Sequence, residues 1–294
     1  MREFGGFSSK KTMAHDSPTP SPAHYPIVFC HGELVPASEV RISPFDAGIE
    51  TGHGIFETLK AIDGEPFATT RHFYRLAHAA KIMRLTTPDE AELTRIMKSV
   101  LDANGLKFAR VRVTITGGNG GQLLIVSALG IPTYTPHATV ITAPFTRNEC
   151  GALVNLKTTS YGENVVAQKL MAEAGVDEAI FANTAGNLCE GSRTNVFAVI
   201  GGKLITPPIE SGCLPGVTRA LTIKLAHENG IECAEQDFTI SDLKGADEAF
   251  LTSSLRDIQP IESVDGQEIP RPEGGVTDHL KTLFSEMVAA DKNP

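Results

Sequence analysis

The stretch LKTTSYGENVVAQKLMAEAGVDEAIFANTAGNLCEGSRTNVF, residues 156 to 197, decides the fold. A helical segment at 163–175 is ended by Gly175, and a β-type run follows at 177–183. After a turn at Gly186 and Asn187, a new strand begins near Asn195. Helix and strand therefore alternate along this stretch, as they do in α/β proteins.

Two charged residues in this stretch are candidates for chemistry. Glu190 lies just before the strand at Asn195, where a solvated surface glutamate is the ordinary interpretation. Lys157 lies in an otherwise uncharged β-type run, with no acidic residue within five positions on either side. A lysine that points to water from an edge strand would explain this pattern. Burial would instead lower the pKa of the amine and leave it free to form a Schiff base.

The regions on either side of this stretch differ in character, which predicts two domains. The first half combines a hairpin and strands with two helices as an α+β unit, and the second half alternates strands and helices. Strands are predicted at 55–62, 109–116, 122–129, 138–143, 152–159, 194–200, 203–207 and 247–254, a hairpin at 26–36, and further helices at 69–85, 87–105, 214–230 and 277–290. We therefore predict a two-domain α+β / α/β protein with a disordered leader (1–25), a small N-terminal domain (26–143), a linker (144–151) and a larger C-terminal domain (152–290).

Composition and charge exclude several classes of protein. The chain of 294 residues has a net charge of -9 without a block of like charges, so it carries neither a nucleic-acid footprint nor a polybasic membrane patch. No apolar run approaches the roughly 20 residues needed to span a bilayer. The five cysteines are scattered without a C-x-x-C spacing, which favours a reducing cytosol and predicts neither disulfides nor a metal site. A cytoplasmic enzyme or binding protein for small molecules fits these features.

Two segments of the second half could bind a phosphate. In LPGVTRA, Gly216 permits a close backbone approach, and Val217 and Thr218 offer free N–H groups at a helix start. In LTSS, Ser253 and Ser254 follow a strand, a usual place for ligand contacts in α/β sheets. The glycine-rich segment 116–124 lacks the Lys-Ser/Thr pair of a P-loop, and a strand-connecting loop is predicted there.

Taken together, these motifs resemble the class IV aminotransferases, the pyridoxal-phosphate enzymes of fold type IV. That family includes branched-chain aminotransferases, D-amino acid aminotransferases and 4-amino-4-deoxychorismate lyases. EGSRTNVF at 190–197 resembles the family's E-G/A-x-x-x-N-x-F, and LPGVTR at 214–219 resembles its L-x-G-x-T-R. DAGIETGHGIFET at 46–58 resembles D-R-G-x-x-x-G-D-G-x-F-E, and HFYRL at 72–76 resembles H-x-x-R-L. The resemblance covers about residues 27 to 285.

The resemblance implies a role for each candidate residue. Lys157 would form the Schiff base with pyridoxal 5'-phosphate and carry the proton between the substrate Cα and the cofactor. Glu190 would face the pyridine nitrogen and keep it protonated, and Tyr161 would bond the ring oxygen. The phosphate would be held by Arg75, Gly216, Val217, Thr218, Ser253 and Ser254. The substrate candidates are Arg112, which could bind a carboxylate or point to solvent, together with Phe56 and Leu255.

Three positions depart from the family pattern. Ala47 replaces the arginine of D-R-G, and His53 replaces the aspartate of G-D-G. Gly117 stands where D-amino acid aminotransferases carry an arginine that binds the substrate carboxylate, which disfavours that branch. His53 is interpreted as a loop residue.

Three functions follow as hypotheses. The first is transamination, in which an amino group moves between an amino acid or amine and a 2-oxo acid. The second is 4-amino-4-deoxychorismate lyase activity, which releases pyruvate and 4-aminobenzoate. The third is a non-catalytic protein that binds pyridoxal phosphate or another phosphorylated metabolite. The resemblance also implies a homodimer, and the loop at 46–54 is the candidate to cross its interface.

Overall fold

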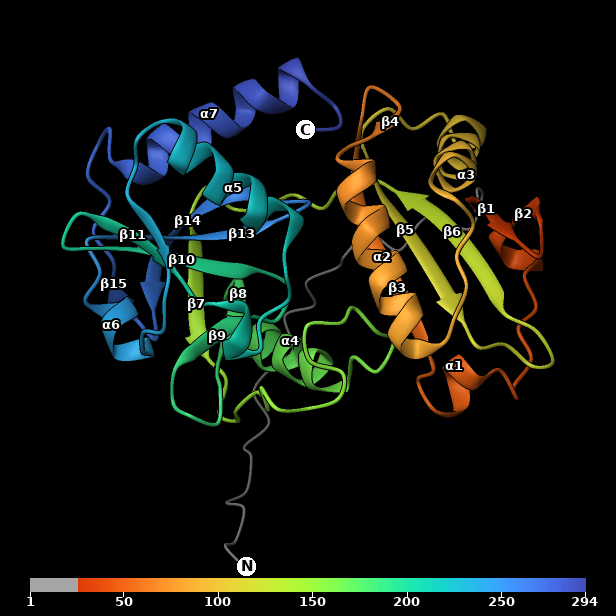
Figure 1. The fold of residues 1–294 in the computed structure, drawn as a ribbon, viewed down its shortest axis with the longest axis horizontal. Helices are drawn as coiled ribbons and strands as arrows, with labels where there is room; N and C mark the ends of the chain where they lie inside the picture. The colour runs from red at the N-terminus through yellow and green to blue at the C-terminus, as the bar shows by residue number, and fades with distance from the viewer. Residues whose placement is uncertain (1–25) are drawn as a thin grey trace, which may run out of the picture.

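The computed structural model describes residues 26–294, so the predicted leader at 1–25 lies outside the described residues. The described chain forms two lobes that each contain one sheet (Figure 1). The first sheet has six strands in the order β2-β1-β6-β5-β3-β4. Their bounds are Ile27–Cys30 (β1), Glu33–Pro36 (β2), Gly54–Ile62 (β3), Glu65–Pro66 (β4), Ala109–Thr116 (β5) and Leu123–Leu129 (β6).

Among residues 26–294, helices pack on one face of the first sheet. The helices of this lobe are α1 (Ala47–Glu50), α2 (Thr69–Met83) and α3 (Glu90–Ala103), beside a short 3-10 turn η1 (Ala37–Glu39). On β5, alternate residues Val111, Val113 and Ile115 are buried in one core with the apolar sides of α2 and α3. Because side chains alternate along a strand, Arg110 and Arg112 point to the opposite face, toward the second lobe. That face is the one available for a site.

The second sheet has nine strands among the described residues. The main order is β12-β11-β10-β13-β14-β7-β8-β9, and β15 pairs with β14. The bounds are Ala138–Thr142 (β7), Glu178–Ala182 (β8), Leu188–Gly191 (β9), Asn195–Ile200 (β10), Lys203–Thr206 (β11), Cys233–Glu235 (β12), Glu248–Ser253 (β13), Asp257–Val264 (β14) and Gln267–Glu268 (β15).

The strand predicted at 138–143 forms as β7, but it does not belong to the first sheet. It runs parallel to both β14 and β8 in the second sheet. The limit between the two sheets therefore precedes Ala138, whereas the predicted N-terminal domain extends to residue 143. The neighbours of β7, which are β8 and β14, both come later in the chain and are separated from it in sequence. The local sequence therefore assigned this strand to the same domain as the strands before it.

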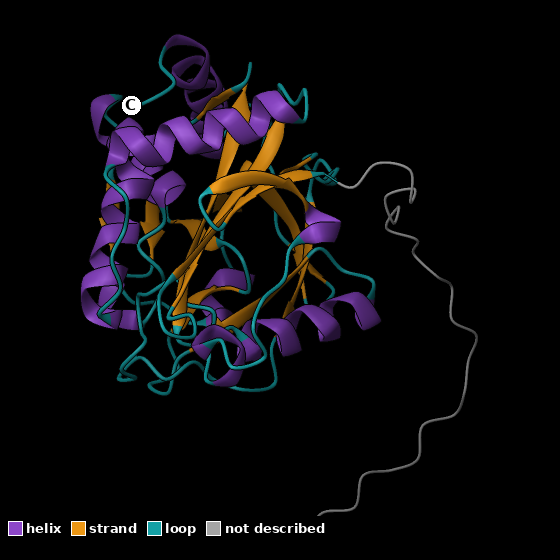
Figure 2. Ribbon diagram, turned by 90° about the vertical axis from the view of Figure 1, so that its right-hand side faces the viewer, coloured by secondary structure: helices purple, strands orange, loops and turns teal. Residues whose placement is uncertain are grey.

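Helices flank the second sheet, and strands fill the interior of both lobes (Figure 2). Leu221 of α5 and Phe284 of α7 share one core with Phe197 and Phe250 of the central strands. The helices of this lobe are α4 (Gly162–Ala174), α5 (Val217–Glu228), α6 (Ile240–Lys244) and α7 (Val276–Ala290), with a 3-10 turn η2 (Ile209–Ser211). Within residues 26–294, no helix has the length and apolar character needed to cross a membrane.

The strand predicted at 152–159 is absent. Residues 151–155 form turns, and Asn155 adopts a left-handed conformation with φ 64° that interrupts an extended chain. Only Thr158 makes an isolated bridge, to Ile55. The Phe56 amide donates to the Lys157 carbonyl, and the Thr159 amide donates to the Gly54 carbonyl, each at 2.9 Å. Lys157 is therefore held in a loop against the start of β3, where the two lobes meet.

Candidate active site

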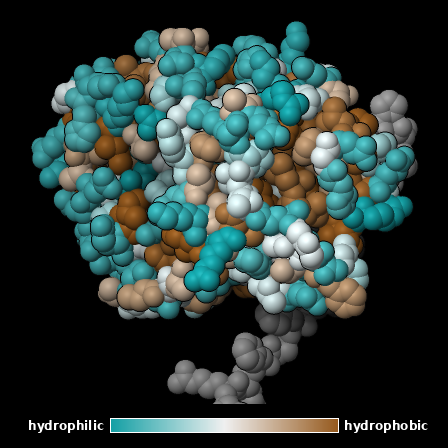
Figure 3. All heavy atoms as spheres, turned by 45° about the vertical axis from the view of Figure 1, so that its right-hand side comes forward, coloured by the Kyte–Doolittle hydropathy of each residue, from teal (hydrophilic) through white to brown (hydrophobic). Residues whose placement is uncertain are grey.

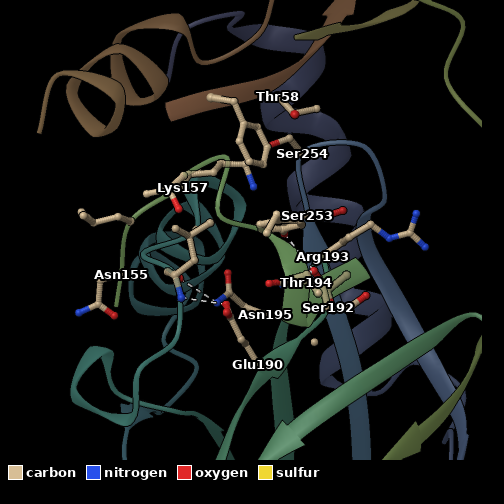
Figure 4. Close-up of a pocket in the computed structure, with 18 of the residues that line it drawn as sticks. Thr58, Asn155, Lys157, Glu190, Ser192, Arg193, Thr194, Asn195, Ser253 and Ser254 are labelled. Carbon is tan, nitrogen blue, oxygen red and sulfur yellow. Dashed lines mark hydrogen bonds between the residues drawn. The ribbon is translucent and has the colours of Figure 1, made fainter. Parts of the chain in front are cut away.

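A cavity of about 810 Å³ lies between the lobes, and every predicted site residue lines it. Figure 4 shows Lys157, Glu190, Ser253 and Ser254 around this space. The first lobe contributes Phe56, Arg75 and Arg112, from β3, α2 and β5. The connecting loop and the second lobe contribute Lys157, Tyr161, Glu190, Gly216, Val217, Thr218, Ser253, Ser254 and Leu255. Residues distant in sequence thus form one site.

The Lys157 amine lies in an aromatic part of the cavity. Its Nζ is 4.5 Å from the centre of the Phe56 ring and 5.7 Å from that of Tyr161. Burial, followed by the positive charge of Arg75, lowers the pKa of Lys157 to about 8. Roughly a tenth of the amine is therefore neutral at pH 7, far more than for an exposed lysine, and this form can act as a nucleophile or accept a proton.

Glu190 is a buried carboxylate on β9 rather than a solvated surface glutamate. Its side chain accepts a hydrogen bond from the Leu214 amide at 2.8 Å, and its Oε1 lies 3.5 Å from Nη2 of Arg147. Burial raises the pKa of Glu190, and Arg147 and the Leu214 amide oppose this shift. A cationic N–H group placed beside this carboxylate would offset its desolvation.

The start of α5 suits a phosphate. Gly216 is the N-cap, no side chain caps the helix, and no acidic residue occupies its first turn. The free N–H groups and the helix dipole therefore favour an anion beside Val217 and Thr218. A Cβ atom on Gly216 would fall 2.0 Å from Oδ1 of Asn195, so the close approach of this turn requires glycine.

Arg75 is fixed by a buried network that the sequence did not predict. Its Nε and Nη2 donate to the carboxylate of Glu57 at 2.7 and 2.8 Å, and Nη1 donates to the Pro215 carbonyl at 3.0 Å. His72 Nδ1 lies 2.7 Å from the same carboxylate, and its Nε2 lies 3.4 Å from the Ser254 hydroxyl. The network thus connects Arg75 with Ser254, across the two lobes.

Charge pairing controls the ionisation of this network. Burial alone would raise the pKa of Glu57, but Arg75 and His72 outweigh it and hold this pKa well below its usual range. Burial lowers the pKa of His72 despite the adjacent Glu57. Both Glu57 and His72 stand in the motifs GIFET and HFYRL, so the sequence contained a signal for them.

An aromatic pair forms the wall next to Lys157. The rings of Phe56 and Tyr161 meet edge to face with 5.4 Å between centroids. The Tyr161 hydroxyl donates to the Ser192 carbonyl at 3.0 Å, and burial raises its pKa. The Arg112 guanidinium lies 3.8 Å above the Phe56 ring centre, and its Nε donates to Thr114. Arg112 therefore points into the cavity rather than to open solvent.

Ser253 and Arg147 complete the polar lining. The Ser253 hydroxyl accepts from the Arg256 amide at 3.2 Å, so it ties the end of β13 to the turn that contains Leu255. Arg147, which contacts Glu190, lies in the segment predicted as a linker, and no local motif indicated it. Its Nη1 donates to Asn164 at 3.3 Å, while its Nε has no hydrogen-bond partner among the described residues.

The three departures from the family pattern lie outside the cavity. His53 Nε2 bonds the Met83 carbonyl at 2.8 Å, at the end of α2. A Cβ atom on Gly117 would fall 2.4 Å from Nδ1 of His53, so the histidine ring occupies the space that a side chain at 117 would need. His53, just before β3, and Gly117 thus form one packing contact, and Gly117 lies in a loop that joins β5 to β6, as predicted for 116–124.

Fold and site together define an enzyme that uses a phosphate-bearing cofactor reactive toward amines. The enclosed amine, the buried carboxylate and the open helix N-terminus match the three ends of pyridoxal phosphate: its aldehyde, ring nitrogen and phosphate. The family model for "Amino-transferase class IV" matches residues 54–264, and the chain belongs to this family.

Relatives and a solved structure agree with this assignment. A protein of Methanocaldococcus jannaschii, provisionally named a branched-chain-amino-acid aminotransferase, is 32% identical over 88% of this chain and 96% of its own length. The aminodeoxychorismate lyase of Bacillus subtilis is 27% identical over 89% of this chain and 94% of its own.

The structure of the T.th. branched-chain amino acid aminotransferase with pyridoxamine 5'-phosphate has a TM-score of 0.83 and 25% identity. The alignment covers 90% of this chain and 95% of that one. The predicted fold type IV is therefore confirmed, pyridoxal phosphate is the cofactor, and the chain is a class IV transaminase.

Proposed function

We propose that the chain transfers an amino group between an α-amino acid and a 2-oxo acid, with Lys157 as the residue that binds the cofactor and moves the proton. The observation that carries this proposal is the Lys157 amine, with a pKa of about 8, in the same cavity as Glu190 and the start of α5. Bound pyridoxal phosphate supplies an aldehyde for the substrate amine and a ring that accepts electron density when Cα loses its proton.

Lys157 can both bind the cofactor and move the proton because part of its amine is neutral near neutral pH. With the cofactor and substrate bound, the Lys157 Nζ would accept the proton from the substrate Cα and donate it again. The Phe56 and Tyr161 rings enclose this nitrogen and limit the access of water. Thr159 and Phe56 hold the loop through backbone hydrogen bonds, which keeps the amine in place.

The remaining cavity residues would bind and orient the cofactor and the substrate. Glu190 would hold a proton on the ring nitrogen, and Tyr161 would bond the ring oxygen. The Val217 and Thr218 amides would hold the phosphate, with the hydroxyls of Thr218, Ser253 and Ser254 beside them and Arg75 as the positive charge. On the substrate side, Arg112 would bind the α-carboxylate, with Phe56 and Leu255 as apolar walls.

A single-turnover spectral assay tests this function. Purified holoenzyme is mixed, without an oxo acid, with L-branched-chain amino acids, L-glutamate, D-alanine, D-glutamate or a simple chiral amine. Conversion of the cofactor absorbance to that of pyridoxamine phosphate by one donor supports transamination and names the donor and its stereochemistry. Borohydride reduction of the holoenzyme before any donor is added should fix the cofactor on Lys157, and a failure to label this residue would remove the proposal.

Lyase activity is the second candidate, because the Bacillus subtilis relative that covers most of this chain is named an aminodeoxychorismate lyase. The same lysine, carboxylate and helix start would serve that reaction. Release of pyruvate from aminodeoxychorismate, without formation of pyridoxamine phosphate, would favour it.

The non-catalytic hypothesis rested on Ala47, His53 and Gly117, and none of these residues lines the cavity.

The functional unit would be a homodimer in the cytoplasm. The loop proposed to cross the interface and the residue just before it expose two large apolar side chains, Ile49 and Phe45, at 61% and 65%. Apolar side chains also reach the surface in several places on the face shown in Figure 3. All five cysteines are free, which agrees with a reducing compartment.

A further inference from the structure

Helix α2 is shared between the cores of the two lobes. Its later part packs in the first lobe, where Leu76 and Ala79 are buried with residues of β3 and β5. The two residues just before the helix, Phe67 and Ala68, are buried instead in the core of the second lobe. The Phe67 ring meets the ring of Phe284 on α7 with 6.4 Å between centroids. The second lobe therefore holds the start of a helix that covers the sheet of the first lobe.

The segment that follows α7, residues 291–294, caps the start of α2 (Figure 1). The Ala68 amide donates to the Lys292 carbonyl at 2.7 Å, and the Thr70 amide donates to Oδ1 of Asn293 at 3.0 Å. Nδ2 of Asn293 donates in turn to the Thr70 hydroxyl at 2.7 Å. Ala68 is the N-cap residue, and its methyl group cannot accept a hydrogen bond. Asn293 therefore does what a Ser, Asp or Asn side chain usually does at the N-cap itself.

The same helix carries two residues of the site within its first two turns. Arg75 lies five positions after Thr70, about 7 Å along the helix axis. Nη1 of Arg75 donates to the Pro215 carbonyl, just before α5, and Nε2 of His72 lies 3.4 Å from the Ser254 hydroxyl. Both contacts cross between the lobes at the end of the cavity proposed for the phosphate. Because a helix is rigid over one or two turns, a shift of the α2 start would displace Arg75 from the start of α5.

We propose that Asn293 is a positioning residue for the cofactor phosphate, because its cap on α2 sets the place of Arg75 opposite the start of α5. The proposal rests on the assignment of Arg75 and the α5 start to the phosphate. Asn293 is exposed and does not line the cavity, so it acts only through α2. Its loss should weaken the binding of a phosphate group and leave the rest of the cofactor held as before.

The test measures the binding of pyridoxal 5'-phosphate and of pyridoxal, which lacks the phosphate, to the cofactor-free enzyme. Absorbance titrations give both dissociation constants for the wild type and for Asn293→Ala. We expect the affinity for pyridoxal phosphate to fall about 3- to 10-fold, because a cap is lost and Arg75 is displaced but still present. The affinity for pyridoxal should change less than about twofold, because its aldehyde and ring nitrogen would contact Lys157 and Glu190 instead.

A conservative variant and a matched control accompany this comparison. Asn293→Asp keeps an oxygen for the Thr70 amide and should recover most of the affinity, because Asp caps helices about as well as Asn. Asn104→Ala removes an asparagine that makes a similar pair of bonds to the Ile27 backbone, each at 2.8 Å, within the first lobe. This control should lower the free energy of unfolding without changing the preference for the phosphate. If it lowers that preference as much as Asn293→Ala does, the effect is a general loss of stability and the proposal is wrong.

The same titrations separate this proposal from the assignment on which it rests. Equal binding of pyridoxal and pyridoxal phosphate to the wild type would overturn the phosphate site and, with it, the role of Asn293. If the wild type prefers the phosphate but Asn293→Ala loses affinity for both compounds equally, or for neither, only the role of Asn293 is overturned. These outcomes do not depend on which donor reacts, so a failure of transamination leaves the test intact.

Discussion

At the residue scale, if Lys157 binds the cofactor as proposed, its ionisation controls when the enzyme can take up pyridoxal phosphate. The nucleophile is the neutral amine, and the pKa of about 8 lies far below the value of an exposed lysine. The rate of attachment of pyridoxal phosphate to the cofactor-free enzyme should therefore rise with pH and level off above about 8. Stopped-flow absorbance from mildly acidic to strongly alkaline pH measures this rate. A rise that continues to the ordinary pKa of lysine, about 10.4, would show that the amine is not desolvated.

Substitution of Lys157 itself should separate binding from chemistry. In Lys157→Ala, the Glu190 carboxylate and the α5 start remain, so the cofactor should still bind, whereas turnover should fall by about 10²- to 10⁴-fold or more with loss of the proton carrier. Lys169→Ala, on α4, removes a lysine that does not line the cavity and serves as the control. If Lys157→Ala retained its turnover, a group other than Lys157 would have to carry the proton.

Substitution of Glu190 should affect the reaction rate in a different way. Replacement by Gln keeps the shape of the side chain but removes the charge that would hold a proton on the ring nitrogen. The rate should fall by about 10²- to 10³-fold, the usual loss when one electrostatic contact to developing charge is removed. Single-turnover kinetics at saturating substrate measure it, with Glu163→Gln at the cavity rim as the control. Retention of the full rate would mean that the ring needs no carboxylate.

At the element scale, the Glu57 network joins β3 to α2. Because Glu57 is buried with both partners, Glu57→Gln should lower the free energy of unfolding by about 3–5 kcal/mol. Glu65→Gln breaks an exposed pair with Lys98 and should cost less than about 1 kcal/mol. Urea titration measures both values. Similar small losses for the two variants would contradict the assignment of Glu57 as a structural anchor.

The same network gives a stability that depends on pH. The folded pKa of Glu57 lies below its unfolded value, so its contribution is fully present above the unfolded pKa, near about 4.3. It is lost as the pH falls from there through the folded pKa. The difference in unfolding free energy between wild type and Glu57→Gln should therefore be constant near neutrality and shrink in acid. If the difference grew in acid, the pKa of Glu57 would not be lowered in the folded protein.

The loop that carries Lys157 depends on a glycine just before β3. Gly52 has φ +69°, and a Cβ atom there would fall 2.4 Å from the Ser160 hydroxyl. Gly52→Ala should displace the loop and lower kcat. Gly64→Ala, at φ +82° with nothing within 4 Å, carries only the left-handed strain of about 1–2 kcal/mol and should keep kcat. Equal kcat values in the two variants would show that the loop tolerates the shift.

Elements with regular local patterns could be predicted from sequence, whereas those set by distant contacts could not. The strand at 109–116 was predicted at its observed bounds because its apolar residues alternate. β14 was missed, since Pro260 argues against a strand between two others. The apolar run at 152–159 predicted a strand, but the loop packs on β3 instead. Lys157 and Glu190 were identified by resemblance, while Arg147 stands in no motif and became visible only in three dimensions.

At the scale of the whole molecule, the exposed apolar side chains of Phe45 and Ile49, in and just before the loop at 46–54, predict a dimer. The wild type should elute with about twice the chain mass of 31.4 kDa. The double variant Phe45→Lys, Ile49→Lys should shift toward the monomer, because two charges would be buried without partners. Phe108→Lys changes a side chain of similar exposure elsewhere and should remain dimeric. Light scattering after gel filtration measures the masses, and a monomeric wild type would contradict the proposal.

The cavity is built from both lobes, and this arrangement links the supply of cofactor to the persistence of the protein. A ligand that binds only the docked arrangement stabilises it by mass action, about 2.7 kcal/mol when its free concentration is about a hundred times its dissociation constant. When free pyridoxal phosphate becomes scarce, the lobes lose that contribution, and more of the chain opens to proteases at any moment. The abundance of this enzyme in a cell would then follow the vitamin B6 status of that cell, without any change in its synthesis.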